Sequence, residues 1–213
     1  MSTGRLTGGT WVLWEHGEPV AEETWQREDT PEGPVWRSAI RSNFPWPYRT
    51  HLTLALTPDL AWRELLIRLE REGEAPVEYR GHPEEAMWLA LRRAGTEESH
   101  GFYDWEPRME IDYPSPLFNT LTLKRLALQE GEARELQVYA IDPFTFTTGR
   151  ILQGYERLAD TQVRCRAGTF QGRHYRYVNA LTKYVGDIYT DEEDNVLDYK
   201  GAWELTEARH GAP

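Results

Sequence analysis

Apolar and polar residues alternate along most of the chain, which is the two-residue period of a half-buried β-strand. The segment 51–56 shows it most clearly, because Leu52, Leu54 and Leu56 fall on one face. Glycine, proline and acidic residues interrupt such segments at short intervals, and no long helical pattern joins them. The pattern therefore predicts a mainly β protein whose sheet is largely antiparallel. The predicted strands are residues 10–13, 19–27, 35–42, 51–56, 109–113, 120–129, 135–141, 150–158, 161–166, 174–178, 184–189 and 196–204.

Residues 59–94 contain two segments that fit a helix as well as a strand. In the first, Trp62, Leu65 and Leu69 have helical spacing, yet every second residue from Leu65 to Leu69 is apolar as well. The second segment starts at Pro83, continues with two glutamates and ends with two arginines, which is the charge order of a helix. We expect at most two short helices in this region.

No proline-, glycine- or serine-rich run divides the chain into parts. A length of 213 residues is enough for one domain with a substantial core. We therefore expect a single domain over residues 1–207 and a flexible tail over residues 208–213.

Aromatic residues supply much of the apolar content, with 9 Trp, 11 Tyr and 6 Phe in a chain whose mean hydropathy is -0.69. These side chains bury large areas, and Trp and Tyr each carry a polar group. They suit broad curved sheets and a lined cavity better than a helix bundle. The formal net charge of -11 disfavours nucleic acid and the anionic face of a membrane as partners.

The sequence lacks the common motifs for metal binding, cofactor binding and catalysis. Cys165 is the only cysteine, so a disulfide or a cysteine-based metal site within the chain is ruled out. The histidines lack metal-ligand spacing, and P-loop, Gly-x-Gly-x-x-Gly, Gly-x-Ser-x-Gly and His-Glu-x-x-His motifs are absent. The N-terminus has no apolar signal-peptide stretch, and no segment offers the ~20 apolar residues of a membrane span. We expect no metal, no cofactor, no transmembrane segment and a cytoplasmic location.

The most informative segment is 110–128, in which Pro114 and Pro116 precede leucines interleaved with polar residues. Proline cannot donate to a sheet, and it pushes the residue before it towards extended geometry. The segment is therefore interpreted as a strand, a rigid elbow and a second strand, with Leu121 and Leu123 in the core.

The same segment resembles the central motif of a family of small bacterial glycolipid-binding proteins. That motif has an aspartate, here Asp112, a Thr/Ser-Pro pair, an Asn-Thr pair and a leucine-rich stretch with two basic residues. Residues 152–158 resemble the family's Gln-x-Tyr-x-Arg segment, and residues 191–203 resemble its C-terminal hairpin. The order and spacing fit over roughly the second half of the chain.

The resemblance implies a large curved antiparallel sheet that forms an incomplete barrel or spiral β-roll, similar in shape to periplasmic lipoprotein carriers. It also implies non-enzymatic binding of an amphipathic ligand, a glycolipid or another long-chain molecule, in an apolar groove of the roll. The residues expected to bind the ligand are Asp112, Ser115, Asn119, Thr120, Arg125 and Tyr155.

These residues also have ordinary structural interpretations. Asn119 and Thr120 follow two prolines, and such residues usually satisfy the backbone of a turn. Arg125 would form an internal ion pair with Asp112 or Glu156.

Two other classes of function stay open. Glu110 and Asp112 would project from one face of a strand, and two carboxylates about 5 to 9 Å apart could serve a hydrolase or isomerase. A sheet face or edge with an exposed apolar patch would instead serve as a protein–protein interaction module.

Overall fold

The computed structural model describes residues 5–106 and 109–211, and these residues form sixteen strands and one helix. The expected fold class, mainly β with antiparallel pairing and few helices, is confirmed. The chain divides into two compact units. The meander unit is Val20–Pro107, and the helix unit is Met1–Pro19 together with Arg108–Pro213. The single domain expected over residues 1–207 stays a prediction.

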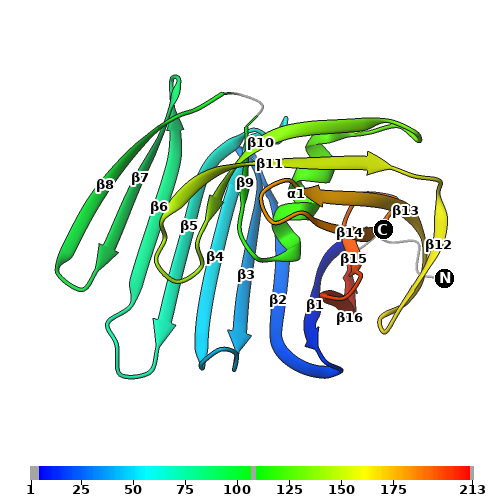
Figure 1. Ribbon diagram of the computed structural model, residues 1–213, viewed down its shortest axis with the longest axis horizontal. Helices are drawn as coiled ribbons and strands as arrows, with labels where there is room; N and C mark the ends of the chain where they lie inside the picture. Colours follow the sequence, from blue (N-terminus) through cyan, green and yellow to red (C-terminus); the bar gives the residue numbers. More distant parts are fainter. Residues whose placement is uncertain (1–4, 107–108, 212–213) are drawn as a thin grey trace. The chain divides into compact units, whose positions relative to one another are not determined.

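The meander unit consists of consecutive strands, each of which pairs antiparallel with the next (Figure 1). Short turns join them, and glycines such as Gly73 and Gly95 supply the positive φ angles of 77° and 58° that these turns require. The strands are β2 (Glu18–Thr30), β3 (Gly33–Ser42), β4 (Tyr48–Leu56), β5 (Trp62–Arg71), β6 (Val77–Glu84), β7 (Met87–Ala94) and β8 (Glu97–Asp104).

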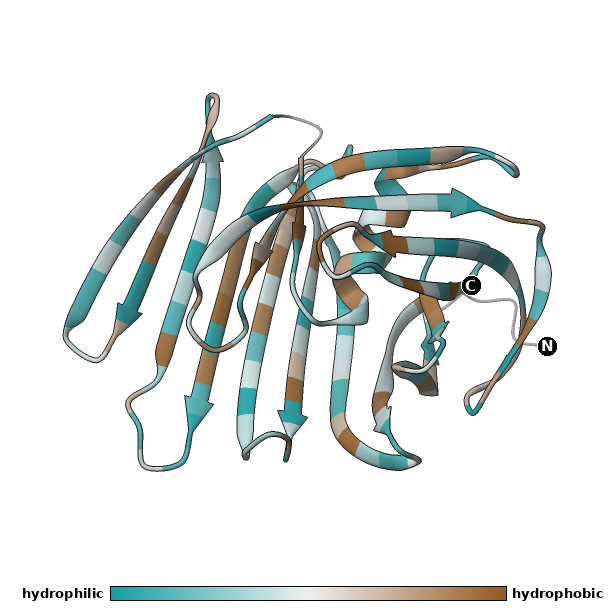
Figure 2. Cartoon of the chain, in the orientation of Figure 1, coloured by the Kyte–Doolittle hydropathy of each residue, from teal (hydrophilic) through white to brown (hydrophobic). Residues whose placement is uncertain are grey.

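One face of the meander is apolar because alternate residues of its central strands are large and apolar. Trp36, Leu54 and Leu65 are cross-strand neighbours on β3, β4 and β5, and all three are fully buried. The other face is charged and carries ion pairs such as Arg68 with Glu70. Figure 2 shows the alternation as brown and teal bands along the strands.

Residues 59–94, where a helix and a strand were both open, form β5, β6 and β7. Every second residue from Leu65 to Leu69 pairs with β4 and β6 and is buried at 0 to 1% exposure. Cross-strand packing on both sides therefore favours the two-residue period over the helical spacing.

The helix unit combines strands from both ends of the chain in the order β1-β16-β15-β14-β13-β11-β10-β9, with β12 beside β13. The pairing of β9 with β10 is parallel, and the other pairings described in this unit are antiparallel. Its strands are β1 (Leu6–Glu15), β9 (Glu110–Asp112), β10 (Ala133–Ile141), β11 (Thr148–Arg157), β12 (Thr161–Cys165), β13 (Gly168–Asn179), β14 (Tyr184–Asp191), β15 (Val196–Tyr199) and β16 (Trp203–His210).

The helix α1 (Pro116–Leu126) replaces the second strand expected after the elbow, so that part of the prediction is wrong. Ser115 caps the helix, because its Oγ accepts a hydrogen bond from the N–H of Leu117 at 3.1 Å. Pro116 occupies the first turn, where its missing N–H costs nothing. The proline that suggested a strand elbow is thus the start of a helix.

The end of α1 is equally well specified. Lys124 and Arg125 lie in the last turn, where positive charge is favourable, and Ala127 ends the helix in the left-handed conformation at φ 46°. Leu121 and Leu123 are buried at 1% and 0% exposure, so their expected place in the core is confirmed although the element differs. Among the described residues, no helix combines the length and the apolar character of a membrane span.

The C-terminal strand expected over residues 196–204 is instead two strands, β15 and β16, with a turn at Gly201. β16 continues to His210, which pairs with Leu6 of β1. Residues 212–213 lie outside the described part of the chain, and the flexible tail expected over residues 208–213 stays a prediction.

Candidate functional site

Four polar side chains from β9, β11 and α1 form a hydrogen-bonded network, here called the polar network. Gln153 Nε2 donates to Asp112 Oδ2 at 2.8 Å. The hydroxyl of Tyr155 lies 3.0 Å from Asn119 Oδ1 and 3.1 Å from Gln153 Oε1, so it can donate to either acceptor. The network therefore links the helix to two strands of the sheet.

Strand alternation explains why β11 contributes two residues to the network. Gln153, Tyr155 and Arg157 are buried on one face, whereas Gly154 and Glu156 face the other way. Thr120 holds α1 against β15, because its Oγ1 accepts a hydrogen bond from the N–H of Val196 at 3.0 Å.

A group of tyrosines adjoins the polar network, here called the tyrosine group: Tyr177, Tyr184 and Tyr199. The ring of Tyr177 lies 5.2 Å from that of Tyr155 and 5.9 Å from that of Tyr199. Tyr184 lies 6.2 Å from both Tyr177 and Tyr199 and is 41% exposed. The rings thus run from the buried network towards solvent and combine apolar faces with hydroxyl donors.

Burial controls the ionisation of this region. It raises the pKa of Asp112 to about 6, against the opposing effect of the hydrogen bonds from Gln153 and the Tyr113 backbone. Burial and then the charge of Asp112 raise the pKa of Tyr155 well above its ordinary value, and the pKa of Tyr177 rises for the same reasons. At neutral pH these tyrosines are therefore hydrogen-bond donors, and Asp112 is an acceptor close to its titration range.

A polar hollow of about 500 Å³ lies beside the network. At its side, the buried carboxylate of Glu110 accepts a hydrogen bond from Arg125 Nη1 at 3.1 Å. The ion pair expected for Arg125 is thus formed with Glu110 and not with Asp112 or Glu156. The residues lining the polar hollow are Glu110, Arg125, Leu126, Arg134, Glu135 and Leu136.

The polar hollow and the polar network are joined through strand pairing. Arg134 is the cross-strand partner of Tyr155, and Leu136 is the partner of Gln153. The guanidinium of Arg134 makes no hydrogen bond or ion pair with any residue that the structure describes.

An apolar groove of about 380 Å³ lies along β11 and β13. Leu152, Val178 and Ala180 line it with Gly154, whose missing side chain leaves the space open. A Cβ added to Gly154 would come within 3.8 Å of Val178 Cβ, an ordinary contact, so a larger side chain here would project into the groove.

The polar hollow and the apolar groove meet at the start of β10. Arg134 and Glu135 line both of them. β9 pairs only with Val138–Ala140, so this part of β10 has no strand partner on that side among the described residues. A ligand could therefore pass from one hollow to the other across an open strand edge.

The structure places the residues expected from the sequence in two groups. Asp112, Asn119 and Tyr155 belong to the polar network, and Arg125 lines the polar hollow. The hydroxyls of Ser115 and Thr120 instead accept backbone N–H groups and hold α1 in place. Asn119 and Thr120 lie inside the helix and not in a turn, and the partner of Thr120 is a distant strand.

Three features of this region are absent from the sequence-based expectations: the tyrosine group, Arg134 and the apolar groove. Tyr175 and Tyr177 are two residues apart on β13 and therefore share a face. Because Tyr177 pairs with Tyr155, the tyrosines of β13 and β11 lie on the same face of the sheet. The position of Arg134 beside the hollow depends on strand pairing, so no pattern in the residues around it predicts that position. Among the described residues, no group of three histidine, cysteine, aspartate or glutamate side chains is placed to hold a metal ion.

Comparisons with known proteins point to one family and one fold. The family model described as "Putative glycolipid-binding" matches residues 12–204. A DUF1089 family protein from Pseudomonas aeruginosa has a similar structure, with a TM-score of 0.65, 22% identity, and coverage of 90% of this chain and 94% of that chain. A β-barrel-like protein of domain of unknown function DUF1849 from Brucella abortus has a TM-score of 0.61 at 10% identity, covering 98% of this chain and 100% of that chain. A search of curated proteins gives no match.

Proposed function

Since the chain belongs to the family described as "Putative glycolipid-binding", we propose that it binds an amphipathic molecule with a hydroxylated head group and an alkyl tail. The head group occupies the polar hollow, and the tail lies in the apolar groove. The ligand crosses β10 at Arg134 and Glu135. The observation that carries this proposal is that both residues line both hollows, because an amphipath needs a polar and an apolar site within its own length.

The side chains of Arg134 and Arg125 support the placement of the head group in the polar hollow. Arg134 has five N–H donors and no partner among the described residues, so it is available to sugar hydroxyls or to other acceptors. Arg125 is already oriented by its ion pair with Glu110. A few fixed polar groups of this kind are what orient ligands in otherwise apolar sites.

The polar network supports the helix that borders the hollow. Asp112, Asn119 and Tyr155 link α1 to β9 and β11, and Tyr155 also lines the apolar groove. None of the three lines the polar hollow, so they act on the head group by holding α1 and its Arg125 in place. Ser115 and Thr120 act indirectly, because their hydroxyls are engaged in holding the helix.

Burial of the tail supplies the affinity. Each methylene transferred from water into an apolar environment contributes about 0.8 kcal/mol. The groove of about 380 Å³ falls within the range of small-molecule sites, so several methylenes would suffice without any ionic contact.

The tail site can be tested with hexyl, octyl and decyl β-glucoside, titrated calorimetrically below their micelle concentrations. Each step of two methylenes should tighten binding by about tenfold. Gly154→Val should reduce this increment, because the new side chain fills the groove. Gly149→Val is the matched control on the same strand, since a Cβ there meets nothing within 4 Å. Equal chain-length increments in both variants would contradict the tail site.

The head-group site has its own test in the same titrations. Arg134→Gln should weaken all three glucosides by the same factor and leave the chain-length increment unchanged. Arg209→Gln, an equal change of charge on an exposed residue of β16, should have no effect. Absence of saturable binding for every glucoside would overturn the proposed function as a whole.

A further inference from the structure

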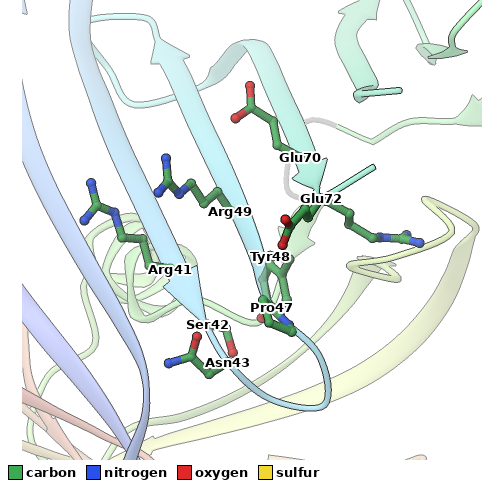
Figure 3. Close-up of a pocket in the computed structure, with 9 residues that line it drawn as sticks. Arg41, Ser42, Asn43, Pro47, Tyr48, Arg49, Glu70 and Glu72 are labelled. Carbon is green, nitrogen blue, oxygen red and sulfur yellow. The ribbon is translucent and has the colours of Figure 1, made fainter. Parts of the chain in front are cut away.

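The meander unit has a hollow of its own, of about 470 Å³, at the ends of β3, β4 and β5. Three arginines, Arg41, Arg49 and Arg71, line it together with Glu70 and Glu72. The hollow is therefore lined by more positive than negative side chains in a chain whose net charge is -11. Figure 3 shows its side chains.

Arg41 and Arg49 stand directly opposite each other on β3 and β4. Both side chains are exposed, and Figure 3 shows their guanidinium groups extending to the same side of the strand pair. Like charges in directly opposed positions destabilise a sheet unless something neutralises them.

Glu22 on β2 and Glu70 on β5 are the other cross-strand neighbours of Arg41 and Arg49, but neither carboxylate forms an ion pair with them. Neither guanidinium makes a hydrogen bond or ion pair within the part of the chain that the structure describes. Glu70 is engaged by Arg68 at 2.9 Å, and Figure 3 shows Glu72 beside Tyr48, away from both guanidinium groups. The two charges are thus left facing the hollow.

We propose that Arg41 and Arg49 bind a tetrahedral oxyanion, a phosphate or sulfate group, in this hollow. Guanidinium groups match the oxygens of such anions with paired, charge-assisted hydrogen bonds. An anion between the two arginines would also remove their mutual repulsion. The proposal concerns the meander unit alone and does not depend on the ligand proposed for the helix unit.

Inorganic phosphate at constant ionic strength is the first probe, with thermal unfolding and calorimetry as readouts. Phosphate should bind saturably and raise the Tm of the unmodified protein, because a ligand of the folded state stabilises it. Arg41→Gln and Arg49→Gln should each weaken binding by about tenfold.

Arg37→Gln is the matched control. Arg37 lies on the same strand and face as Arg41, but its guanidinium pairs with Glu28 at 2.6 Å and lies outside the hollow. Its replacement should change phosphate affinity by less than about twofold, since exposed charges beyond the site are screened. Phosphate binding that is absent, or that falls equally in Arg37→Gln, would overturn the proposal.

A second measurement identifies the source of the anion. The turn after β3 exposes Phe44 and Trp46, at 54% and 44%, next to this hollow, which would suit an anion held at a lipid surface. Given phosphate binding, co-sedimentation with phosphatidylcholine vesicles that contain phosphatidic acid, lost in Arg49→Gln, would assign a lipid head group. Phosphate binding without co-sedimentation would assign a free phosphate or a water-soluble ester.

Discussion

Asp112 is the residue whose chemistry depends most on its surroundings. Its carboxyl group is largely shielded from water, which raises its pKa from 3.8 to about 6, even though Gln153 donates a hydrogen bond to it. The folded protein therefore takes up this proton at a higher pH than the unfolded chain does. Between these two pKa values, the contribution of Asp112 to the free energy of unfolding falls as the pH rises.

Replacing the carboxyl group with a neutral amide should remove this pH dependence. As the pH rises from 4 to 7, Asp112→Asn should gain stability relative to the unmodified protein. The gain in the free energy of unfolding should reach roughly 3 kcal/mol, because the pKa rises from 3.8 to about 6 and each pKa unit corresponds to about 1.4 kcal/mol. Urea unfolding of both proteins across this range measures the difference. Asn can still accept the hydrogen bond from Gln153, so the contact itself is kept.

Asp142 provides the matched control at the residue scale. Its slight burial raises its pKa, but hydrogen bonds from Thr145 and from the backbone of Phe144 outweigh burial and lower the pKa overall. Because this pKa lies below 3.8 in the folded protein, Asp142→Asn should lose relative stability only as the pH rises up to about 4, and its difference from the unmodified protein should stay nearly constant from pH 4 to 7. A pH-independent difference for Asp112→Asn would contradict the raised pKa.

At the scale of elements, α1 is the feature that organises the helix unit. It supplies Asn119 to the polar network, Arg125 to the polar hollow and Thr120 to β15. A helix of 11 residues is marginal by itself, so its end signals and its packing must both contribute to its stability.

The cap of α1 can be tested directly. Ser115→Ala removes the acceptor for the N–H of Leu117 and should lower the free energy of unfolding by about 1 kcal/mol. Ser115→Thr should restore most of this loss, because threonine also caps. Ser99→Ala, in exposed strand β8, is the control and should be nearly neutral. Equal stability of Ser115→Ala and Ser99→Ala in chemical denaturation would show that the cap does not matter.

At the scale of the whole molecule, the two ends of the chain meet in one sheet. β1 pairs with β16, and Trp11 on β1 is fully buried, with its Nε1 donating to the carbonyl of Val196 on β15 at 2.9 Å. Both C-terminal strands therefore complete the sheet of the helix unit.

A chain that ends at Asn195 should not fold into a soluble form. It would lack β15 and β16, leave the edge of β1 unpaired and expose Trp11. Size-exclusion chromatography and near-ultraviolet circular dichroism would measure the outcome. The full-length variant Arg209→Ala, which changes an exposed residue of β16, should behave normally. A monomeric truncated chain with native spectra would contradict this role of the C-terminal strands.

Local periodicity and composition were enough to predict several features of this protein. Alternation gave the mainly β class and most strand positions, and it placed Leu121 and Leu123 in the core. The motif around Asp112 identified the family that the model over residues 12–204 confirms. These features could be predicted because each depends on residues that are close together in the sequence.

The tertiary structure decided the rest. In residues 116–126, the alternation of leucines favours a strand, whereas the cap at Ser115 and the basic last turn favour a helix. The segment forms a helix, and this helix packs against β9 and β15. The ion pair of Arg125 with Glu110 depends on the packing of α1 against β9, and the meeting of the two hollows at Arg134 depends on the pairing of β10 with β11. Local sequence specifies the period of an element, whereas the partner of a side chain depends on contacts between distant segments.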